Sequence, residues 1–238
     1  MNVLIITLGN SEIQFDINKL GDCQLIESNI CYENISIPVY KNTRVNQSQF
    51  LIPRYSRDGG LDIIENFDKL EKILIFPIVE PLPKFILENE IFKVIFIATD
   101  QDDINHRKGD TIHYAKIIQK YFCEVKNLKS IEYETIFIRK NLKEIDYQYE
   151  TIGIELDKTI GSSKVEDKIY LFAQGGVDQI NHALTLQLLY RYKQRVNIYQ
   201  KAEDEELNKL EFPHLFLKDL NKQKLIKHIQ DYDFGKAS

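Results

Sequence analysis

The sequence predicts an α/β protein: a Rossmann-like, mainly parallel sheet with helices on both faces, followed by a small C-terminal helical segment. The first observation is the continuous apolar run at 3–7, which is typical of a central strand covered on both faces. The second is the alternation of short apolar runs with helix-periodic stretches between 61 and 200, which predicts right-handed crossovers between parallel strands. The third is that three strands end in glycines and small polar residues, where doubly wound sheets bind ligands.

Local patterns place the individual elements. Apolar runs predict strands at 3–7, 72–76, 92–98, 130–138, 168–173 and 194–200, and the alternation within 130–138 places that strand near an edge. Apolar spacings of three and four residues predict helices at 61–70, 81–89, 111–122, 143–160, 177–192 and 218–232. Asp110 or Thr111 is expected to cap the helix at 111–122.

The segment 14–60 is expected to be an irregular insertion within one domain that spans 1–201. Residues 23–27 and 35–40 could pair as a small hairpin, in which Pro38 restricts the second strand to an edge. The polar stretch 42–58 is expected either to reach over the ligand site or to be a solvated loop.

That polar stretch carries Arg44, Arg54 and Arg57 and is followed by the pair Gly59-Gly60. After Lys201 the composition becomes acidic, which predicts a boundary there and a separate C-terminal segment, 202–238, with an amphipathic helix.

Composition excludes several function classes. With 238 residues, 43% hydrophobic and 28% charged, the chain has the make-up of a soluble globular protein. Its formal net charge of −5 argues against binding duplex nucleic acid, though not against a small anionic ligand held in a local pocket. The three cysteines lack metal-ligand spacing, so we expect reduced thiols and a cytoplasmic location. No apolar run approaches about 20 residues, so no membrane span is expected, and 1–6 is a strand pattern rather than a signal peptide.

The motifs of common cofactor enzymes are missing from the sequence. There is no P-loop, no G-x-G-x-x-G after the first strand and no G-x-S-x-G elbow. The five histidines show no metal-ligand spacing. We therefore expect neither a cofactor nor a metal.

The three polar strand ends are expected to meet at one edge of the sheet and to form one ligand site. Backbone N–H groups at glycines beside a helix N-terminus suit phosphate, and side-chain amides suit hydroxyls or base edges. Arg107 and Lys108, near the start of the helix at 111–122, also suit a phosphate or a nearby carboxylate. The alternative is that they belong to a solvated charged loop. The residues expected to hold phosphate are Gly9, Gly175 and Gly176, and those expected to contact sugars or base edges are Asn10, Gln101, Asp102, Gln179 and Asn181.

Three motifs, in this order and spacing, resemble the CRISPR-associated Rossmann-fold (CARF) sensor domains over about 1–200. They are Thr7-Leu8-Gly9-Asn10-Ser11, the strand end Thr99-Asp100-Gln101 followed by 108–111, and 174–181 before a helix. One departure is Gly-Gly-Val-Asp at 175–178, where the ribonuclease-fused branch has Gly-Gly-Thr-Pro, which argues against a HEPN-linked protein.

The resemblance implies a homodimer that binds a cyclic oligoadenylate of type III CRISPR antiviral signalling across its two-fold axis. Residues 8–11, 99–101 and the 175–181 turn would line that pocket, with Arg107 and Lys108 as further contacts. The ligand is expected to be cyclic tetra-adenylate, and the C-terminal segment is expected to be a connector that transmits binding to a fused or associated effector.

Two alternatives remain open. The first is a ring nuclease that cleaves the bound ligand, for which Ser11, Arg107 and Lys108 are the candidates to stabilise the developing charge, without a convincing general base. The second is an unrelated doubly wound nucleotide-handling enzyme that uses Asp100 or Asp178.

Overall fold

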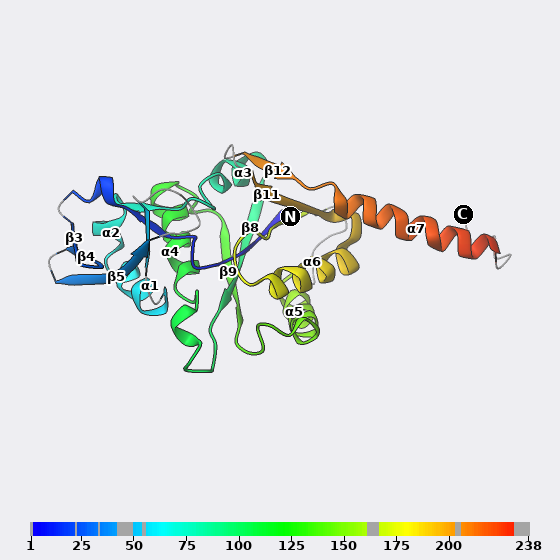
Figure 1. The fold of residues 1–238 in the computed structure, drawn as a ribbon. Coiled ribbons are helices and arrows are strands. Elements are labelled where there is room, and N and C mark those ends of the chain that lie inside the picture. The colour runs from blue at the N-terminus through cyan, green and yellow to red at the C-terminus, as the bar shows by residue number, and fades with distance from the viewer. Residues whose placement is uncertain are drawn as a thin grey trace.

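The computed structural model describes residues 2–21, 23–32, 34–41, 50–53, 56–160, 167–202 and 206–230. In this part of the chain the main sheet has the strand order β12-β11-β10-β1-β8-β9 (Figure 1). Its pairs are parallel except β11 with β12, so the predicted mainly parallel sheet is confirmed. The strands are β1 (Asn2–Thr7), β8 (Ile91–Thr99), β9 (Glu132–Ile138), β10 (Ile169–Phe172), β11 (Val196–Lys201) and β12 (Leu207–Lys209).

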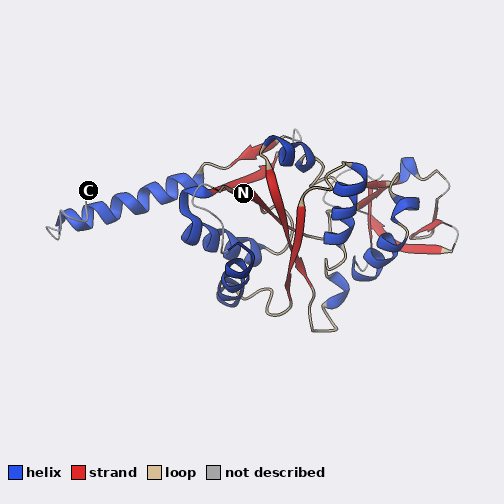
Figure 2. Ribbon diagram, turned by 180° about the vertical axis from the view of Figure 1, so that it is seen from behind, coloured by secondary structure: helices blue, strands red, loops and turns tan. Residues whose placement is uncertain are grey.

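Helices cover both faces of the main sheet (Figure 2). Along β1, Leu4 and Ile6 pack in one core with α3 (Leu82–Glu88) and α4 (Tyr114–Lys120), which a π-helical turn at Tyr121–Val125 continues. The alternate residues Val3 and Ile5 pack in a second core with α5 (Ile145–Ile160) and α6 (Asp178–Tyr192). A strand buried on both faces accounts for the continuous apolar run of β1.

The strand order places a topological switch point at the centre of the sheet. From β1 the chain passes to β8 and then outward to β9, and it later returns to β10 on the other side of β1 and moves outward to β11. The carboxyl ends of β1, β8 and β10 are therefore neighbours, in the position where open α/β sheets bind ligands.

The insertion predicted as irregular is in fact a second sheet, with the order β3-β4-β5-β6-β2-β7. It lies on the α4 side of the molecule with α1 (Ser56–Glu65) and α2 (Phe67–Leu70) (Figure 1). Most of its strands are only two to four residues long, which is too short to show a clear periodicity in the sequence. They are β2 (Gln14–Asp16), β3 (Gln24–Ile26), β4 (Asn29–Tyr32), β5 (Ile35–Lys41), β6 (Phe50–Pro53) and β7 (Leu74–Ile75).

Two predictions within the insertion were wrong. The proposed partners 23–27 and 35–40 do not pair, because β4 lies between β3 and β5. Nor is β5 an edge strand: its pairing with β6 begins at Val39, just after Pro38, so the missing N–H of Pro38 lies outside that ladder. The expected strand at 72–76 forms β7 of this second sheet rather than a strand of the main one. Arg44 and Arg54 lie outside the described residues.

Two helices begin earlier than the sequence predicted. Helix α1 starts at Ser56 and includes Gly59 and Gly60, and the small size of Gly60 allows close packing against the start of α4. Helix α7 (Phe212–Gln230) starts six residues before the expected 218 and projects away from the body (Figure 1). Strand β12, in the segment predicted as a connector, was missed altogether. Three short 3-10 turns, at Ile17–Lys19, Arg107–Gly109 and Lys193–Arg195, complete the described elements. None of the described helices is long and apolar enough to cross a membrane.

Candidate ligand-binding site at the switch point

A cavity of about 500 Å³ lies at the carboxyl ends of β1, β8 and β10. All three polar strand ends contribute to it, as predicted. Of the expected site residues, those that line it are Leu8, Gly9, Asn10, Ser11, Thr99, Gln101, Gly175 and Gly176. Further lining residues are Glu12, Tyr40, Ile52, Ile78, Gly109, Thr111, Leu142, Gln174 and Val177.

The other expected residues lie outside the cavity lining. Asp178 is exposed in the first turn of α6, followed by Gln179, which is partly buried. Arg107 is partly buried and Lys108 is exposed in the short turn before α4. Of the candidates for ring cleavage, only Ser11 is therefore at the cavity.

Asp100 and Asn181 act behind the cavity wall. The Asp100 carboxylate accepts a hydrogen bond from Arg57 at 2.9 Å and also lies 3.5 Å from the Arg139 guanidinium. Asn181 donates from Nδ2 to the Gly175 carbonyl at 2.9 Å, which links the start of α6 to the turn before it. Both residues support the strand ends from which the lining residues come.

Three glycines let the β1 and β10 ends touch. A Cβ on Gly9 would lie 2.6 Å from the Gly176 nitrogen, and a Cβ on Gly175 would overlap the Glu12 carboxyl. Gly176 has a φ of +85°, which favours glycine. Thr7 closes the junction by donating from Oγ1 to the Gly175 carbonyl at 2.8 Å. The two turns therefore form one packed unit.

Glu12 is the most deeply buried polar residue among the lining residues that sequence reasoning missed. Its Oε1 accepts the Gly9 N–H at 2.7 Å, so that N–H is not free for phosphate as we had expected. The side chain is fully buried, and burial raises the pKa of the carboxyl group from 4.5 to about 8. No sequence pattern distinguishes it, because its burial depends on a turn from the other half of the chain.

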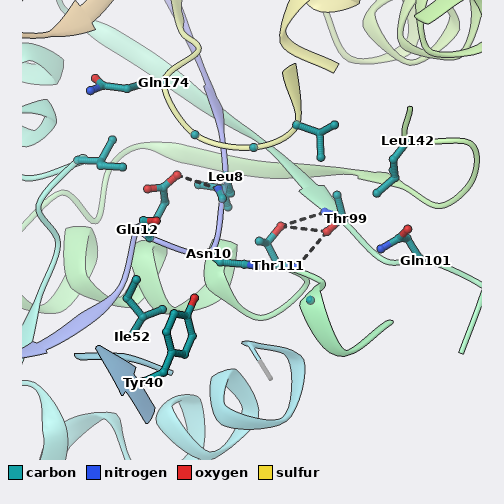
Figure 3. A pocket seen from close by; sticks show the side chains of 17 residues that line it. Leu8, Asn10, Glu12, Tyr40, Ile52, Thr99, Gln101, Thr111, Leu142 and Gln174 are labelled. Atoms are coloured by element: carbon teal, nitrogen blue, oxygen red, sulfur yellow. Dashed lines mark hydrogen bonds between the residues drawn. The ribbon is translucent and has the colours of Figure 1, made fainter. Parts of the chain in front are cut away.

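The β8 end is held by side chains from the segment that follows it. Thr99 and Thr111 each donate a backbone N–H to the other's hydroxyl, at 3.0 and 3.1 Å (Figure 3). The buried Asp110 carboxylate accepts from the Gln101 backbone at 2.7 Å and from its amide at 2.9 Å. The prediction that Asp110 or Thr111 caps α4 was wrong, since their side chains instead hold 99–101 in place.

The insertion does reach the cavity. Figure 3 shows Tyr40 and Ile52, from β5 and β6, at one side of it and Gln101 and Leu142 at the other. The Ser56 hydroxyl at the start of α1 donates to Asn10 Oδ1 at 3.0 Å, which leaves the Asn10 amide nitrogen as the donor end. The Arg57 guanidinium bridges Asp100 and Asp110, so this arginine is not part of a solvated loop.

The cavity lacks the positive side chains that are usual in a site for an anion, as far as the described residues show. Among the described residues that line it, none is Arg, Lys or His. A second cavity of about 540 Å³ adjoins the first and shares Gln101, Leu142 and Val177 with it. Its lining includes Arg139, Lys140 and Lys143 together with three carboxylates. In the described part of the chain no group of His, Cys, Asp or Glu side chains could hold a metal ion.

The doubly wound sheet and the cavity at its switch point define a Rossmann-like protein with a ligand-sized site. Among solved structures, the chain is similar to Enterococcus italicus Csm6 bound to cyclic hexa-2'-fluoro-hexa-dAMP, with a TM-score of 0.55 and 12% sequence identity. The match covers 100% of this chain and 47% of that one, so the chain spans about half the length of this neighbour. The likeness shows a shared fold, in agreement with the fold that the resemblance to CARF domains implied. No family model and no curated protein matches the sequence.

Proposed function

We propose that the chain is a sensor domain that binds a cyclic oligoadenylate in the switch-point cavity. The observation that carries the proposal is the convergence of three polar strand ends on one cavity, in a fold shared with a protein bound to a cyclic adenylate derivative. Rossmann-like sheets serve many ligands, so the fold alone would not suffice.

The lining fits the parts of an adenylate. The Asn10 amide nitrogen can donate to a ribose hydroxyl or a base edge. The amide oxygen of Gln101, whose nitrogen already donates to Asp110 and to the His106 carbonyl, can accept from one. Tyr40, on β5, offers an aromatic face on which a base can stack. The phosphates are expected to face the adjoining cavity, where the ion pairs that Arg139 and Lys140 form with the described residues Asp100 and Asp102 are long, at 3.5 Å. Such exposed pairs are weak and can exchange partners.

We further propose that two chains share one ligand. A cavity of about 500 Å³ is ample for a nucleotide but small for a whole ring. A two-fold dimer would offer the same surface to each half of a symmetric ring. Binding would then change the dimer arrangement, and α7 would carry that change toward an effector.

Isothermal titration calorimetry with cyclic tetra-adenylate and cyclic hexa-adenylate tests the proposal, with linear tetra-adenylate as the control. We expect cyclic tetra-adenylate to bind at one ring per two chains. The titration also compares it with cyclic hexa-adenylate, which has as many nucleotides as the ligand in the structural neighbour. Binding of neither ring at micromolar protein would overturn the proposal. Binding of a mononucleotide by a monomer would favour the unrelated nucleotide-handling enzyme.

Asn10→Ala removes the side-chain amide nitrogen that can donate to the ligand. The affinity should fall roughly tenfold, which corresponds to the loss of about one hydrogen bond. Asn208→Ala is the matched control, since Asn208 is exposed on β12. Equal affinities of the two variants would place the ligand elsewhere.

The ligand recovered after these titrations also tests ring cleavage. We expect an intact ring, because Arg107 and Lys108 lie outside the cavity lining. A linear or 2',3'-cyclic phosphate product would instead favour the ring-nuclease alternative.

A further inference from the structure

Glu12 is a buried acid in a cavity proposed to take a polyanion. Its side chain is fully buried, and among the described residues its Oε2 has no hydrogen-bond partner. No function considered so far uses it.

The position of the carboxyl group links two of the three strand ends. Its Oε1 accepts the Gly9 N–H of the first turn at 2.7 Å. The same oxygen occupies the space that a Cβ on Gly175 of the third turn would take. Glu12 therefore fills the gap between the two turns from behind the cavity surface.

The surroundings favour the neutral acid. Among the described titratable groups, Tyr114 from α4 interacts electrostatically with Glu12 and also with Tyr40 from β5. Burial raises the pKa of Tyr114 well above its usual range, and its hydroxyl has no hydrogen-bond partner among the described residues. In the described part of the chain no cationic side chain contributes to the pKa of Glu12, whose rise comes from burial against the opposing Gly9 hydrogen bond. An ionised Glu12 would be an unpaired buried charge, which such a site disfavours.

We propose that Glu12 is a positioning residue whose neutral carboxyl group holds the Gly9 and Gly175 turns together, so that ligand binding is coupled to the proton that Glu12 carries. The coupling to the ligand rests on the proposed function. The phosphates of a ligand bound in the cavity, although they face the adjoining one, disfavour ionisation of Glu12 further, and by linkage the neutral form binds the ligand more tightly. Above about pH 8 the protein must take up a proton in order to bind.

Titration of cyclic oligoadenylate between about pH 6.5 and about pH 9.5 tests this coupling. We expect the affinity to be constant between about pH 6.5 and about pH 7. Above about pH 8 the affinity should decrease with pH, with a limiting slope of about tenfold per pH unit. Near pH 8.5 the observed enthalpy should depend on the ionisation enthalpy of the buffer, because a proton is taken up.

The Glu12→Gln variant keeps the size and the acceptor oxygen but cannot ionise. The affinity of this variant for the ligand should not depend on pH. Its binding enthalpy should not depend on the ionisation enthalpy of the buffer. Glu88→Gln, which alters an exposed carboxyl group on α3, is the matched control and should keep the wild-type profile. A flat wild-type profile, or a pH dependence that persists in Glu12→Gln, would overturn the coupling.

The protein without ligand gives an independent readout. Relative to Glu12→Gln, the melting temperature of the wild type should fall between about pH 5 and about pH 8. If no cyclic oligoadenylate binds but this difference is seen, the proposed ligand is wrong and the neutral Glu12 stands. If the difference does not change with pH, Glu12 does not hold a proton and the inference fails.

Discussion

The Gly9 and Gly175 turns can touch because glycine has no side chain. At Gly175 a methyl group would overlap the Glu12 carboxyl and lie 2.7 Å from the Thr7 carbonyl oxygen. Both neighbours are fixed, one by its hydrogen bond to Gly9 and the other by its strand. Close backbone approach, rather than free N–H groups, is therefore the main role of these glycines in the described structure.

Gly175→Ala should destabilise the fold by about 1–3 kcal/mol, the usual cost of overpacking. Gly109→Ala is the matched control, since Gly109 lines the same cavity but a Cβ there would meet its nearest neighbour at 3.8 Å. Urea unfolding of both variants measures the difference. Equal free energies of unfolding would show that the two turns do not pack as described.

Glu12 makes the stability of the wild type depend on pH. Because the pKa of its carboxyl group is raised from 4.5 to about 8, the folded state holds the proton more tightly than the unfolded chain. The stability that this proton confers is complete below about pH 4.5 and is lost as the pH rises to about 8. At 1.36 kcal/mol per pKa unit the loss reaches roughly 5 kcal/mol as an upper value. Glu12→Gln should therefore be more stable than the wild type at pH 8 and nearly equal to it at pH 5, in denaturant titrations at each pH.

Among the elements, α1 fixes the insertion to the main sheet. Arg57, one residue into this helix, contacts Asp100 at 2.9 Å and the buried Asp110 at 3.1 Å. Asp110 in turn holds Gln101 at the cavity. The placement of the β8 end therefore depends on an ion pair with a helix that lies outside the main sheet.

Arg57→Ala should destabilise the protein by roughly 3 kcal/mol, because it leaves the buried Asp110 carboxylate without its cation. Arg139→Ala removes the other, exposed partner of Asp100 and should cost less than about 1 kcal/mol. Adding Asp110→Asn to Arg57→Ala should recover part of the loss. Chemical denaturation of the three variants checks the order, and a larger loss for Arg139→Ala would contradict the assigned roles.

At the scale of the whole molecule, α7 stands apart from the two cores. It projects from the body (Figure 1). In its first part, Pro213 is buried and Leu217 packs against the second core. Apolar side chains of this helix are exposed along its length: Phe212, Leu215, Phe216, Leu220, Leu225, Ile226 and Ile229. The stability of the sheet therefore depends little on this helix.

A chain truncated to 1–211 should keep one cooperative thermal transition within a few degrees of the full chain. Ile152→Ala, which truncates a side chain of α5 buried in the second core, should instead cost about 2–5 kcal/mol. Calorimetry of both proteins checks the contrast. Loss of the cooperative transition on truncation would show that α7 is part of the core.

The sequence by itself determined the main sheet and the meeting of its three polar ends. Residues 3–7, 92–98 and 168–173 are apolar runs whose local pattern specifies buried strands, and parallel connection then places their carboxyl ends at one edge. The position of each residue just after an apolar run also predicted that Gly9, Gly175, Gly176 and Thr99 lie at this edge.

Only the tertiary structure decided how that edge becomes a cavity. Glu12 is buried by a turn at 175, Tyr40 and Ile52 reach the site from a second sheet, and Arg57 pairs with a carboxylate 53 residues away. Each role depends on contacts between segments that are distant along the chain, and a local sequence pattern records periodicity and turn chemistry but not which distant segments meet.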